Sequence, residues 1–315
     1  MHLTFRQLQV FEAVARHLNY TRAAEELFMT QPAVSGHVRQ MEEAAGLPLI
    51  EQVGKRLYLT EAGEEVQKAA LDVINRGEAL EMRLADLAGM IRGRLRLAVT
   101  TTAKYFVPHL LGAFSRRYPG VDVRLEVSNR ETVLERLAAN EDELAIMGRV
   151  PQGMHVTGTA FTRNPLVVVA PPEHPLAQEH GIAPERLAEE TFLLREPGSG
   201  TRLAMEQFFS ERGLSLKGGM ELGSNETIKQ AVMAGLGLSV LSWHTLPLER
   251  ATGRLAILDV EGFPLQRHWY AVHLKDKRLS VVAATFLEFL VGEGADLIEP
   301  ASFGGGGAEM ETGTS

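Results

Sequence analysis

Three patterns of hydrophobic and polar positions follow one another along the chain. From residue 4 to residue 46, apolar side chains recur every three or four positions, which is typical of short amphipathic helices. Between residues 61 and 92, steps of four and three continue without a slip. From residue 93 on, short apolar runs alternate with helical stretches. The pattern therefore predicts three regions of different architecture.

The first region predicts three helices followed by a hairpin. The helices span residues 4–18, 22–27 and 30–46. Thr4, Thr21 and Thr30 stand at their starts and have side chains suited to capping. Residues 49–60 then predict two strands around a basic turn, which would form a wing. We expect a winged helix-turn-helix domain over residues 1–60.

The second region predicts one long helix over residues 61–92. Its heptad-spaced positions are Val66, Ala70, Val73, Gly77, Leu80, Leu84, Leu87 and Ile91. This spacing is typical of a two-stranded coiled coil. The alternative is a helix packed on its own domain, but the sequence offers no neighbouring helix for that. We expect a linker helix that pairs two chains.

The third region, residues 93–300, predicts an α/β domain. Strands are predicted at 95–99, 122–127, 144–147, 166–170, 191–194, 220–222, 238–241 and 268–274, and helices at 105–117, 131–139, 202–212, 226–234 and 279–291. Alternating strands and helices imply a largely parallel sheet. Because the chain returns after a second α/β unit, we expect two lobes joined by two crossover strands. Lobe I takes residues 93–163 and 269–295, and lobe II takes residues 164–268.

Composition narrows the class of protein. The chain has no cysteine, so disulfides and thiol chemistry are excluded. Neither a signal peptide nor a long uncharged apolar run is present, and we expect a cytoplasmic, nucleoid-associated protein without a membrane partner. The net charge of −8 hides a balanced N-terminal segment, so charge leaves DNA binding open. The small and polar residues 301–315 predict a disordered tail.

The N-terminal segment resembles the LysR-type family of transcriptional regulators. The resemblance rests on Phe5, Leu8, Phe11, Ala15, the run Thr21–Leu27, the run Thr30–Ser35, Glu42, Gly46, Leu49 and the run Leu59–Gly63. A weaker resemblance extends to about residue 295. It implies an α/β protein with an N-terminal α winged helix-turn-helix, a long linker helix and a two-lobed effector domain. That effector domain would be periplasmic-binding-protein-like (type 2).

The resemblance implies double-stranded promoter DNA and RNA polymerase as partners. The third helix would present Gln31, Ser35 and Arg39 to the major groove and the phosphates. For any one of these residues taken alone, a solvated helix face is the more common explanation. The motif as a whole favours DNA contact. The candidate DNA-binding residues are Thr21, Arg22, Thr30, Gln31, Pro32, Ser35, Gly36, His37, Arg39, Lys55 and Arg56.

The sensing region resembles a subgroup of the family, the Calvin-cycle (RuBisCO operon) regulators known as CbbR. The matching segments are Thr100–Phe106, Asn129–Val133, Asn140–Gly148 and Gly181–Arg202. Members of this subgroup are thought to respond to sugar phosphates, phosphoenolpyruvate or NADPH. The resemblance therefore implies an activator with a phosphorylated small-molecule effector and no other cofactor.

Two loops have the chemistry to hold such an anion. Residues 100–102 follow a predicted strand and precede a helix, where α/β sheets bind ligands. Residues 198–202 repeat this arrangement with glycines, hydroxyls and a cation. Ordinary capped helix starts are the alternative explanation. The candidate effector-binding residues are Thr100, Thr101, Thr102, Lys104, Asn129, Glu131, Ser199, Thr201, Arg202 and Asn225.

Enzyme motifs are missing from the sequence. It contains no Gly-x-Ser-x-Gly elbow, phosphate-binding Walker loop or metal-binding histidine pair, so we expect neither a catalytic nor a metal site. Two alternatives stay open: a LysR-type regulator with an organic-acid effector, and a two-lobed solute-binding protein. The choice between homodimer and homotetramer also stays open, as does whether the effector activates or represses.

Overall fold

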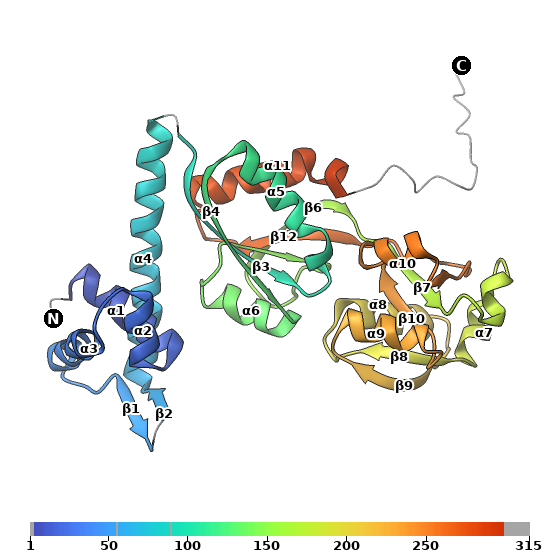
Figure 1. The fold of residues 1–315 in the computed structure, drawn as a ribbon, viewed down its shortest axis with the longest axis horizontal. Coiled ribbons are helices and arrows are strands. Elements are labelled where there is room, and N and C mark those ends of the chain that lie inside the picture. The colour runs from blue at the N-terminus through green and yellow to red at the C-terminus, as the bar shows by residue number, and fades with distance from the viewer. Residues whose placement is uncertain (1–2, 55, 89, 299–315) are drawn as a thin grey trace. The chain divides into compact units, whose positions relative to one another are not determined.

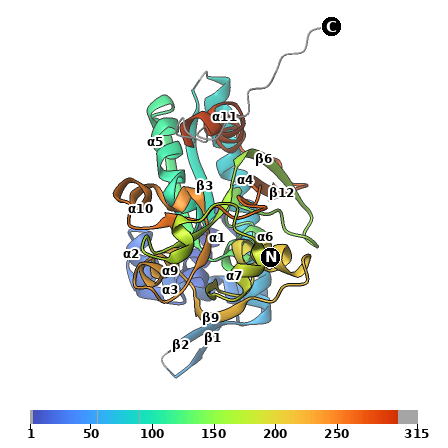
Figure 2. The ribbon, with the colours of Figure 1, turned by 90° about the vertical axis from the view of Figure 1, so that its right-hand side faces the viewer.

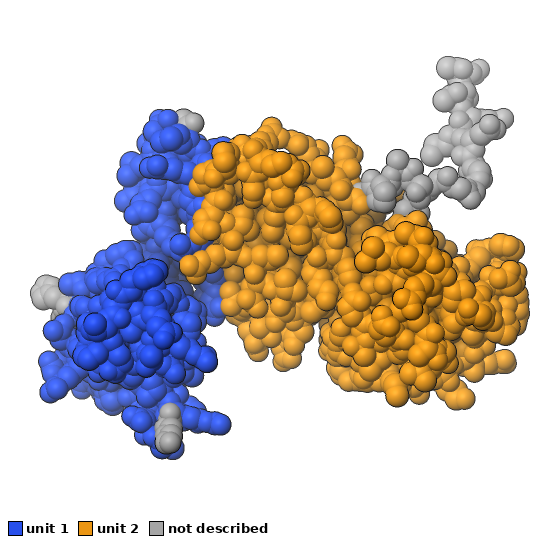
Figure 3. All heavy atoms as spheres, viewed as in Figure 1, with its two compact units in different colours: residues 1–94, 138–141 blue, residues 95–137, 142–315 orange. Residues whose placement is uncertain are grey.

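The structure is a computed structural model that describes residues 3–54, 56–88 and 90–298. It divides into two units (Figure 3). Unit 1 comprises residues 1–94 with the short stretch 138–141, and unit 2 comprises residues 95–137 and 142–315. The predicted disordered tail, residues 301–315, lies outside the described residues. No helix in the described ranges is long and apolar enough to cross a membrane.

Unit 1 contains the predicted helices and hairpin (Figure 1). Its elements are α1 (Phe5–His17), α2 (Tyr20–Glu26), α3 (Gln31–Ala45), β1 (Ile50–Val53), β2 (Arg56–Leu59) and α4 (Glu61–Leu87). β1 and β2 pair antiparallel. Phe11, Val34 and Met41 are completely buried in the core that the first three helices share. Ala23 and Ala24 belong to the same core, where their small side chains let α2 approach its neighbours.

Capping explains where three of these helices begin. Thr30 accepts a hydrogen bond from the Ala33 amide at 3.4 Å, and Thr4 and Thr60 cap α1 and α4 in the same way. The prediction that Thr21 caps the second helix is wrong. Asn19 accepts hydrogen bonds from the amides of residues 21 and 22 at 2.9 and 3.1 Å, so α2 begins earlier than predicted.

The predicted linker helix of residues 61–92 is shorter than expected, because α4 ends at Leu87 and the heptad position Ile91 lies outside it. The heptad positions within α4 differ in exposure along the helix. Near its start, Ala70 is buried and Gly77 lies against the Phe5 ring, so this part of the helix packs on its own domain. Farther on, Leu80, Leu84 and Leu87 are 58%, 59% and 84% exposed. The helix thus packs against α1, and over its second half it carries a row of exposed apolar side chains, Leu80, Leu84 and Leu87, which we call the apolar seam.

Lobe I of unit 2 is a five-stranded sheet with helices on both faces. The strands lie in the order β4 (Gly120–Ser128), β3 (Arg92–Thr100), β5 (Leu144–Met147), β12 (His268–Leu274) and β6 (Val156–Arg163). Its helices are α5 (Val107–Arg117), α6 (Arg130–Ala138) and α11 (Val281–Ile298). α5 and α11 lie side by side in Figures 1 and 2. Between them, the rings of Phe114 and Phe286 meet edge-on with their centroids 4.9 Å apart.

Lobe II contains a three-stranded and a two-stranded sheet. The first has the order β10 (Ser239–Ser242), β7 (Leu166–Ala170) and β11 (Ala256–Ile257), and the second pairs β8 (Thr191–Arg195) with β9 (Lys217–Leu222). The helices are α7 (Pro184–Ala188), α8 (Gly200–Ser210), α9 (Asn225–Met233) and α10 (Pro247–Thr252). Short 3-10 turns are η2 (Pro175–Gln178) and η3 (Trp243–Thr245) in lobe II, and η1 (Ala103–Tyr105) in lobe I.

The expectation of a largely parallel sheet is only partly correct. β3 and β5 are parallel, and so are β8 and β9. β12 instead runs antiparallel to β5 and β6, and β7 runs antiparallel to β10 and β11. β12 reverses direction because it brings the chain back from lobe II. β6 was not predicted, since its Thr- and Gly-rich sequence gives a weak strand signal.

The two predicted crossover segments are present and bind each other. The Asn164 amide donates to the Arg267 carbonyl at 2.7 Å. Leu166 and Leu265 exchange both backbone hydrogen bonds, at 3.0 and 2.9 Å. The lobes are therefore joined by a short antiparallel ribbon rather than by two independent linkers.

Candidate ligand site and nucleic-acid interface

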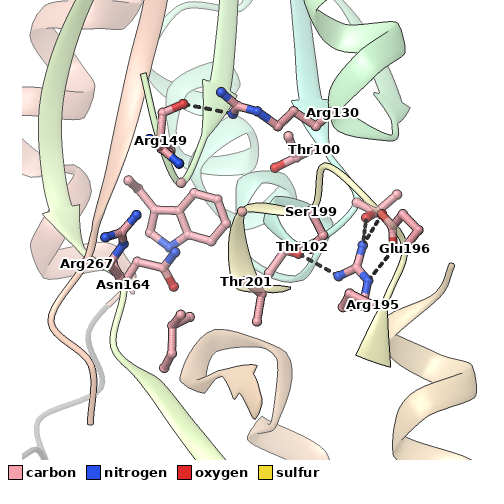
Figure 4. Close-up of a pocket in the computed structure, with 15 residues that line it drawn as sticks. Thr100, Thr102, Arg130, Arg149, Asn164, Arg195, Glu196, Ser199, Thr201 and Arg267 are labelled. Carbon is pink, nitrogen blue, oxygen red and sulfur yellow. Dashed lines mark hydrogen bonds and ion pairs between the residues drawn. The ribbon is translucent and has the colours of Figure 1, made fainter. Parts of the chain in front are cut away.

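A cavity opens in unit 2 where the strand ends of both lobes meet the crossover ribbon (Figure 4). Its volume is about 510 Å³, counting the part open to solvent. Its lining is dominated by hydroxyl and guanidinium groups with one indole. The lining residues are Thr100, Thr101, Thr102, Arg130, Gly148, Arg149, Asn164, Leu166, Arg195, Glu196, Ser199, Gly200, Thr201, Arg267 and Trp269.

Local structure presents the hydroxyls to this cavity. Thr100 is the last residue of β3, and the two residues after it turn toward η1. In lobe II, Gly198 adopts a φ of +80°, which turns the chain into α8. Ser199 makes no side-chain cap hydrogen bond there, so the first amides of α8 are left for a ligand.

One of the four lining arginines is fixed in a hydrogen-bonded network. The Arg195 side chain is only 4% exposed and makes two 2.7 Å contacts with Glu196. It also donates to the side-chain amide oxygen Oδ1 of Asn225 at 2.6 Å and to the Thr101 hydroxyl at 3.3 Å. Its charge is thus neutralised, and it ties lobe II to the threonine loop of lobe I.

The other three arginines leave the cavity with uncompensated positive charge. Arg130 donates to the Arg149 carbonyl at 2.8 Å. Burial, together with the charge of Arg149, lowers the pKa of Arg130. Within the described residues, the guanidinium groups of Arg149 and Arg267 have no hydrogen-bond or ion-pair partner. Four guanidinium groups and a single carboxylate therefore favour an anion with more than one negative charge.

The structure brings together five of the residues predicted for effector binding. Thr100, Thr101, Thr102, Ser199 and Thr201 all line the cavity. Both predicted loops therefore face the same space, as Figure 4 shows for their labelled residues.

The remaining predicted residues do not line the cavity. Lys104, Glu131 and Asn129 lie outside it, and Asn129 instead caps α6 by accepting from the Thr132 amide at 2.9 Å. Arg202 forms ion pairs with Glu206 and Glu221, each at 2.7 Å.

Asn225 is a supporting residue behind the cavity. It is 2% exposed, holds Arg195 and donates to the Thr102 hydroxyl at 3.2 Å.

Sequence reasoning missed the arginines of the cavity. Arg130, Arg149, Arg195 and Arg267 come from separate segments, and no spacing pattern connects them. Two weak signals existed. Arg195 is the last residue of the strand β8, and Arg130 lies inside the Asn129–Val133 segment that carries the family resemblance.

A buried histidine supports the floor of the cavity. The Trp269 indole, which lines the cavity, donates to His244 Nδ1 at 3.3 Å. Burial lowers the pKa of His244 to about 4. The imidazole is therefore neutral at neutral pH, with Nδ1 as the acceptor.

This histidine should make stability depend on pH. Its folded pKa lies below its unfolded value, so the stabilisation is complete above about pH 6.5 and is lost as the pH falls toward about 4. We expect the free energy of unfolding of unit 2 to fall by about 2 kcal/mol between pH 7 and pH 5. Urea unfolding at several pH values checks this. His244→Gln should make the free energy of unfolding less dependent on pH, whereas replacement of the exposed His109 by glutamine should not. An equal pH dependence in both variants would contradict the assignment to His244.

In unit 1, six of the predicted DNA-binding residues lie on α3, namely Gln31, Pro32, Ser35, Gly36, His37 and Arg39. Gln31, Pro32 and Arg39 are exposed, and residues 35–37 are partly exposed. Arg39 pairs with Glu43 at 3.2 Å, but both side chains are largely solvated, so this pair can open easily. A Cβ at position 36 would meet no atom within 4 Å, so the fold does not require glycine there.

The neighbouring elements add to this surface. Thr21, Arg22 and Thr30 are exposed at the starts of α2 and α3, and Arg56 is exposed in the hairpin. Lys55 lies outside the described residues. The arrangement presents the start of α3 together with cations from two other elements, which suits phosphate and groove contacts. No group of acidic and histidine side chains in the described part of the chain is arranged to hold a metal ion.

Comparison with known proteins finds a family match for the N-terminal helix-turn-helix region and another for the two-lobed region. The family model "Bacterial regulatory helix-turn-helix protein, lysR family" matches residues 5–64, and "LysR substrate binding domain" matches residues 88–295. The RuBisCO operon transcriptional regulator of Acidithiobacillus ferrooxidans is 52% identical over 295 residues, covering 94% of this chain and 96% of that protein. The HTH-type transcriptional activator CmpR of Synechocystis sp. is 51% identical over 287 residues, covering 91% and 94%.

A solved structure resembles the sensing region. The Synechocystis CcmR regulatory domain in complex with 2-PG is 48% identical with a TM-score of 0.61, covering 63% of this chain and 95% of that chain. These matches extend over the helix-turn-helix, the long helix and the two lobes. The chain therefore belongs to the LysR family of bacterial helix-turn-helix transcriptional regulators.

Proposed function

We propose that this protein regulates transcription of a RuBisCO operon in response to a phosphorylated metabolite bound between its lobes. The observation that carries the proposal is the cavity itself, which combines four guanidinium groups, one carboxylate and a ring of hydroxyls. A regulator of such an operon is among its relatives, and the similar CcmR domain is described in complex with 2-PG.

The cavity residues suggest how an anion is held. Arg149 and Arg267 supply unpaired guanidinium groups that can each form two parallel hydrogen bonds to a phosphate or carboxylate. Thr100, Ser199 and Thr201 supply hydroxyl donors, and the start of α8 supplies amides. Because these groups come from both lobes, a bound anion would favour the lobe spacing seen here.

DNA recognition would use the surface on α3. Gln31 and Ser35 can bond to base edges, and Arg39 and Arg56 suit phosphates. The exposed seam of α4 would pair two chains and so fix the distance between two α3 helices on an inverted repeat. Effector binding would change the arrangement of the pair and the DNA path that RNA polymerase meets. Since the similar CmpR is an activator, we propose activation as the outcome.

Tryptophan fluorescence tests the effector class. Trp269 lines the cavity, and Trp243 is the other tryptophan, so Trp243→Phe leaves a single reporter. We expect 2-PG and phosphoenolpyruvate to change the emission saturably and to raise the melting temperature. Pyruvate, which lacks the phosphate of phosphoenolpyruvate, should do neither at the same concentration.

Promoter footprinting completes this test. Protection of RuBisCO promoter DNA at a stated salt concentration should change when the saturating phosphorylated compound is added. A response to pyruvate but to neither phosphorylated compound would favour the organic-acid alternative. Absence of any protected promoter sequence would overturn the proposed function.

A further inference from the structure

A second group of side chains connects the two lobes beside the cavity. Tyr105, from η1 of lobe I, donates its hydroxyl to Glu226 of α9 at 2.5 Å. Lys229, one turn farther along α9, lies 4.8 Å from the centroid of the Tyr105 ring. Its ammonium contacts Glu226 at 3.0 Å and Glu249 of α10 at 2.9 Å. We call Tyr105, Glu226, Lys229 and Glu249 the tyrosine latch.

The latch is held in a defined geometry by burial and charge. The Lys229 side chain is 3% exposed, and a buried ammonium is tolerated only when it is paired and hydrogen-bonded. Besides the two carboxylates, it donates to the Thr245 carbonyl at 3.1 Å. Lys229 therefore fixes the position of Glu226, the group that accepts the bond from Tyr105.

The bond between Tyr105 and Glu226 is charge-assisted, and the Glu226 side chain that accepts it is 49% exposed. Burial and the Glu226 carboxylate raise the pKa of Tyr105 well above its usual range, so the phenol stays a donor. Burial alone would raise the pKa of Glu226, but the bonds from Tyr105 and Lys229 hold it below its usual value. The donor is neutral and the acceptor ionised across the neutral pH range.

The latch and the cavity share their supporting segments. The lining residue Thr102 lies three positions before Tyr105, in the same loop and turn. Asn225, which bonds to Thr102 and Arg195, begins the helix that carries Glu226 and Lys229. A movement that separates Tyr105 from Glu226 would also pull the threonine loop away from lobe II.

We propose that Tyr105 is a positioning residue whose hydroxyl holds the lobes at the spacing that the anion cavity requires, and so sets effector affinity without touching the effector. The proposal deepens the proposed function and rests on it for the identity of the ligand. The latch itself, however, concerns lobe spacing, which can be measured with no ligand present.

Lobe spacing can be measured directly because the chain has no cysteine. Spin labels at Glu135→Cys on α6 and Ser210→Cys at the end of α8, both exposed, report one distance from lobe I to lobe II. Full-length labelled chains are diluted with unlabelled chains, so that only distances within one chain are read. Without effector, Tyr105→Phe should give a longer and broader distance distribution than the wild type. An unchanged distribution would overturn the proposal.

Affinity supplies the second readout. The dissociation constant for 2-PG should rise about tenfold in Tyr105→Phe, since a bond to a charged group is lost while the ring stays. Glu226→Gln should produce a similar rise, and the double variant should be no weaker than either single variant. Additive effects, or wild-type affinity in Tyr105→Phe, would overturn the proposal.

A matched control excludes a general effect of removing a phenol. Tyr118, at the end of α5 in lobe I, has no hydrogen-bond partner for its hydroxyl within the described residues, so Tyr118→Phe should alter neither readout. A merely structural role for Tyr105 would lower the melting temperature and leave the affinity of the folded protein unchanged. If the wild type binds neither 2-PG nor phosphoenolpyruvate, the proposed function fails, while the distance measurement still decides about the latch.

Discussion

Replacing Arg149 with glutamine should weaken binding of 2-PG by about 100-fold, because a bidentate charged contact is lost. The same change should leave the unliganded protein at least as stable. Arg149 lowers the pKa of the buried Arg130, which means that the two cations repel each other when no anion is present. Calorimetric titration and thermal unfolding of the unliganded protein measure the two effects, which have opposite signs.

Arg202→Gln tests whether Arg149, as the structure indicates, or Arg202, as the sequence predicted, is the cation that binds the effector. Arg202 looked like the cation of the second anion-binding loop, yet its charge is engaged by Glu206 and Glu221. We expect less than about a fivefold loss of 2-PG affinity, transmitted through its bond to the Arg195 carbonyl. A larger loss in Arg202→Gln than in Arg149→Gln would show that the cavity has been assigned to the wrong cations.

The double variant Leu80→Glu and Leu84→Glu should convert the protein to monomers at micromolar concentration. Both side chains are more than half exposed in the single chain, so the substitutions remove little intrachain packing. They would place like charges along the seam where two α4 helices meet. Operator affinity should then fall about 1000-fold, because one chain can engage only one half-site.

Sedimentation and gel-shift measurements at one fixed salt concentration check this outcome. Asp86→Ala serves as the matched control, since this exposed residue lies on the same stretch of α4 but off the heptad positions. A double variant that stays dimeric, or that keeps wild-type operator affinity as a monomer, would show that α4 does not pair the chains.

The helices of unit 1 could be predicted because their signals are local. Thr30 caps α3, and Gly46 ends it with a φ of +70°, a conformation that glycine adopts without strain. Even here, the capping residue of α2 was predicted wrongly. Asn19 competes with Thr21 for the start of α2 and prevails because its side chain reaches two amides.

Strand direction in unit 2 could not be read from the sequence. The apolar run of β12 looks the same whether the strand runs parallel or antiparallel to β5, and only the return of the chain from lobe II decides it. Short local patterns also mislead when burial differs. Asn129 and Asn225 open similar Ser-Asn segments, yet one caps a helix at the surface and the other holds a buried arginine.

In the candidate site, too, the features with local sequence signals could be predicted and those that depend on tertiary structure could not. Its hydroxyls sit in two contiguous loops and were found from the sequence, with Thr100 and Ser199 among them. Its charges were not found, because Arg149 and Arg267 are isolated in sequence and meet only after the lobes have assembled. The net charge of −8 gave no hint of a locally positive cavity.

The ribbon between the lobes restricts how they can move. Since its two segments are bonded to each other through Asn164, Leu166, Leu265 and Arg267, they must bend and twist together as one hinge. Three of these residues also form part of the cavity wall. A ligand in the cavity would contact this hinge as well as the two lobes. It would therefore directly resist twisting of one lobe against the other about the hinge.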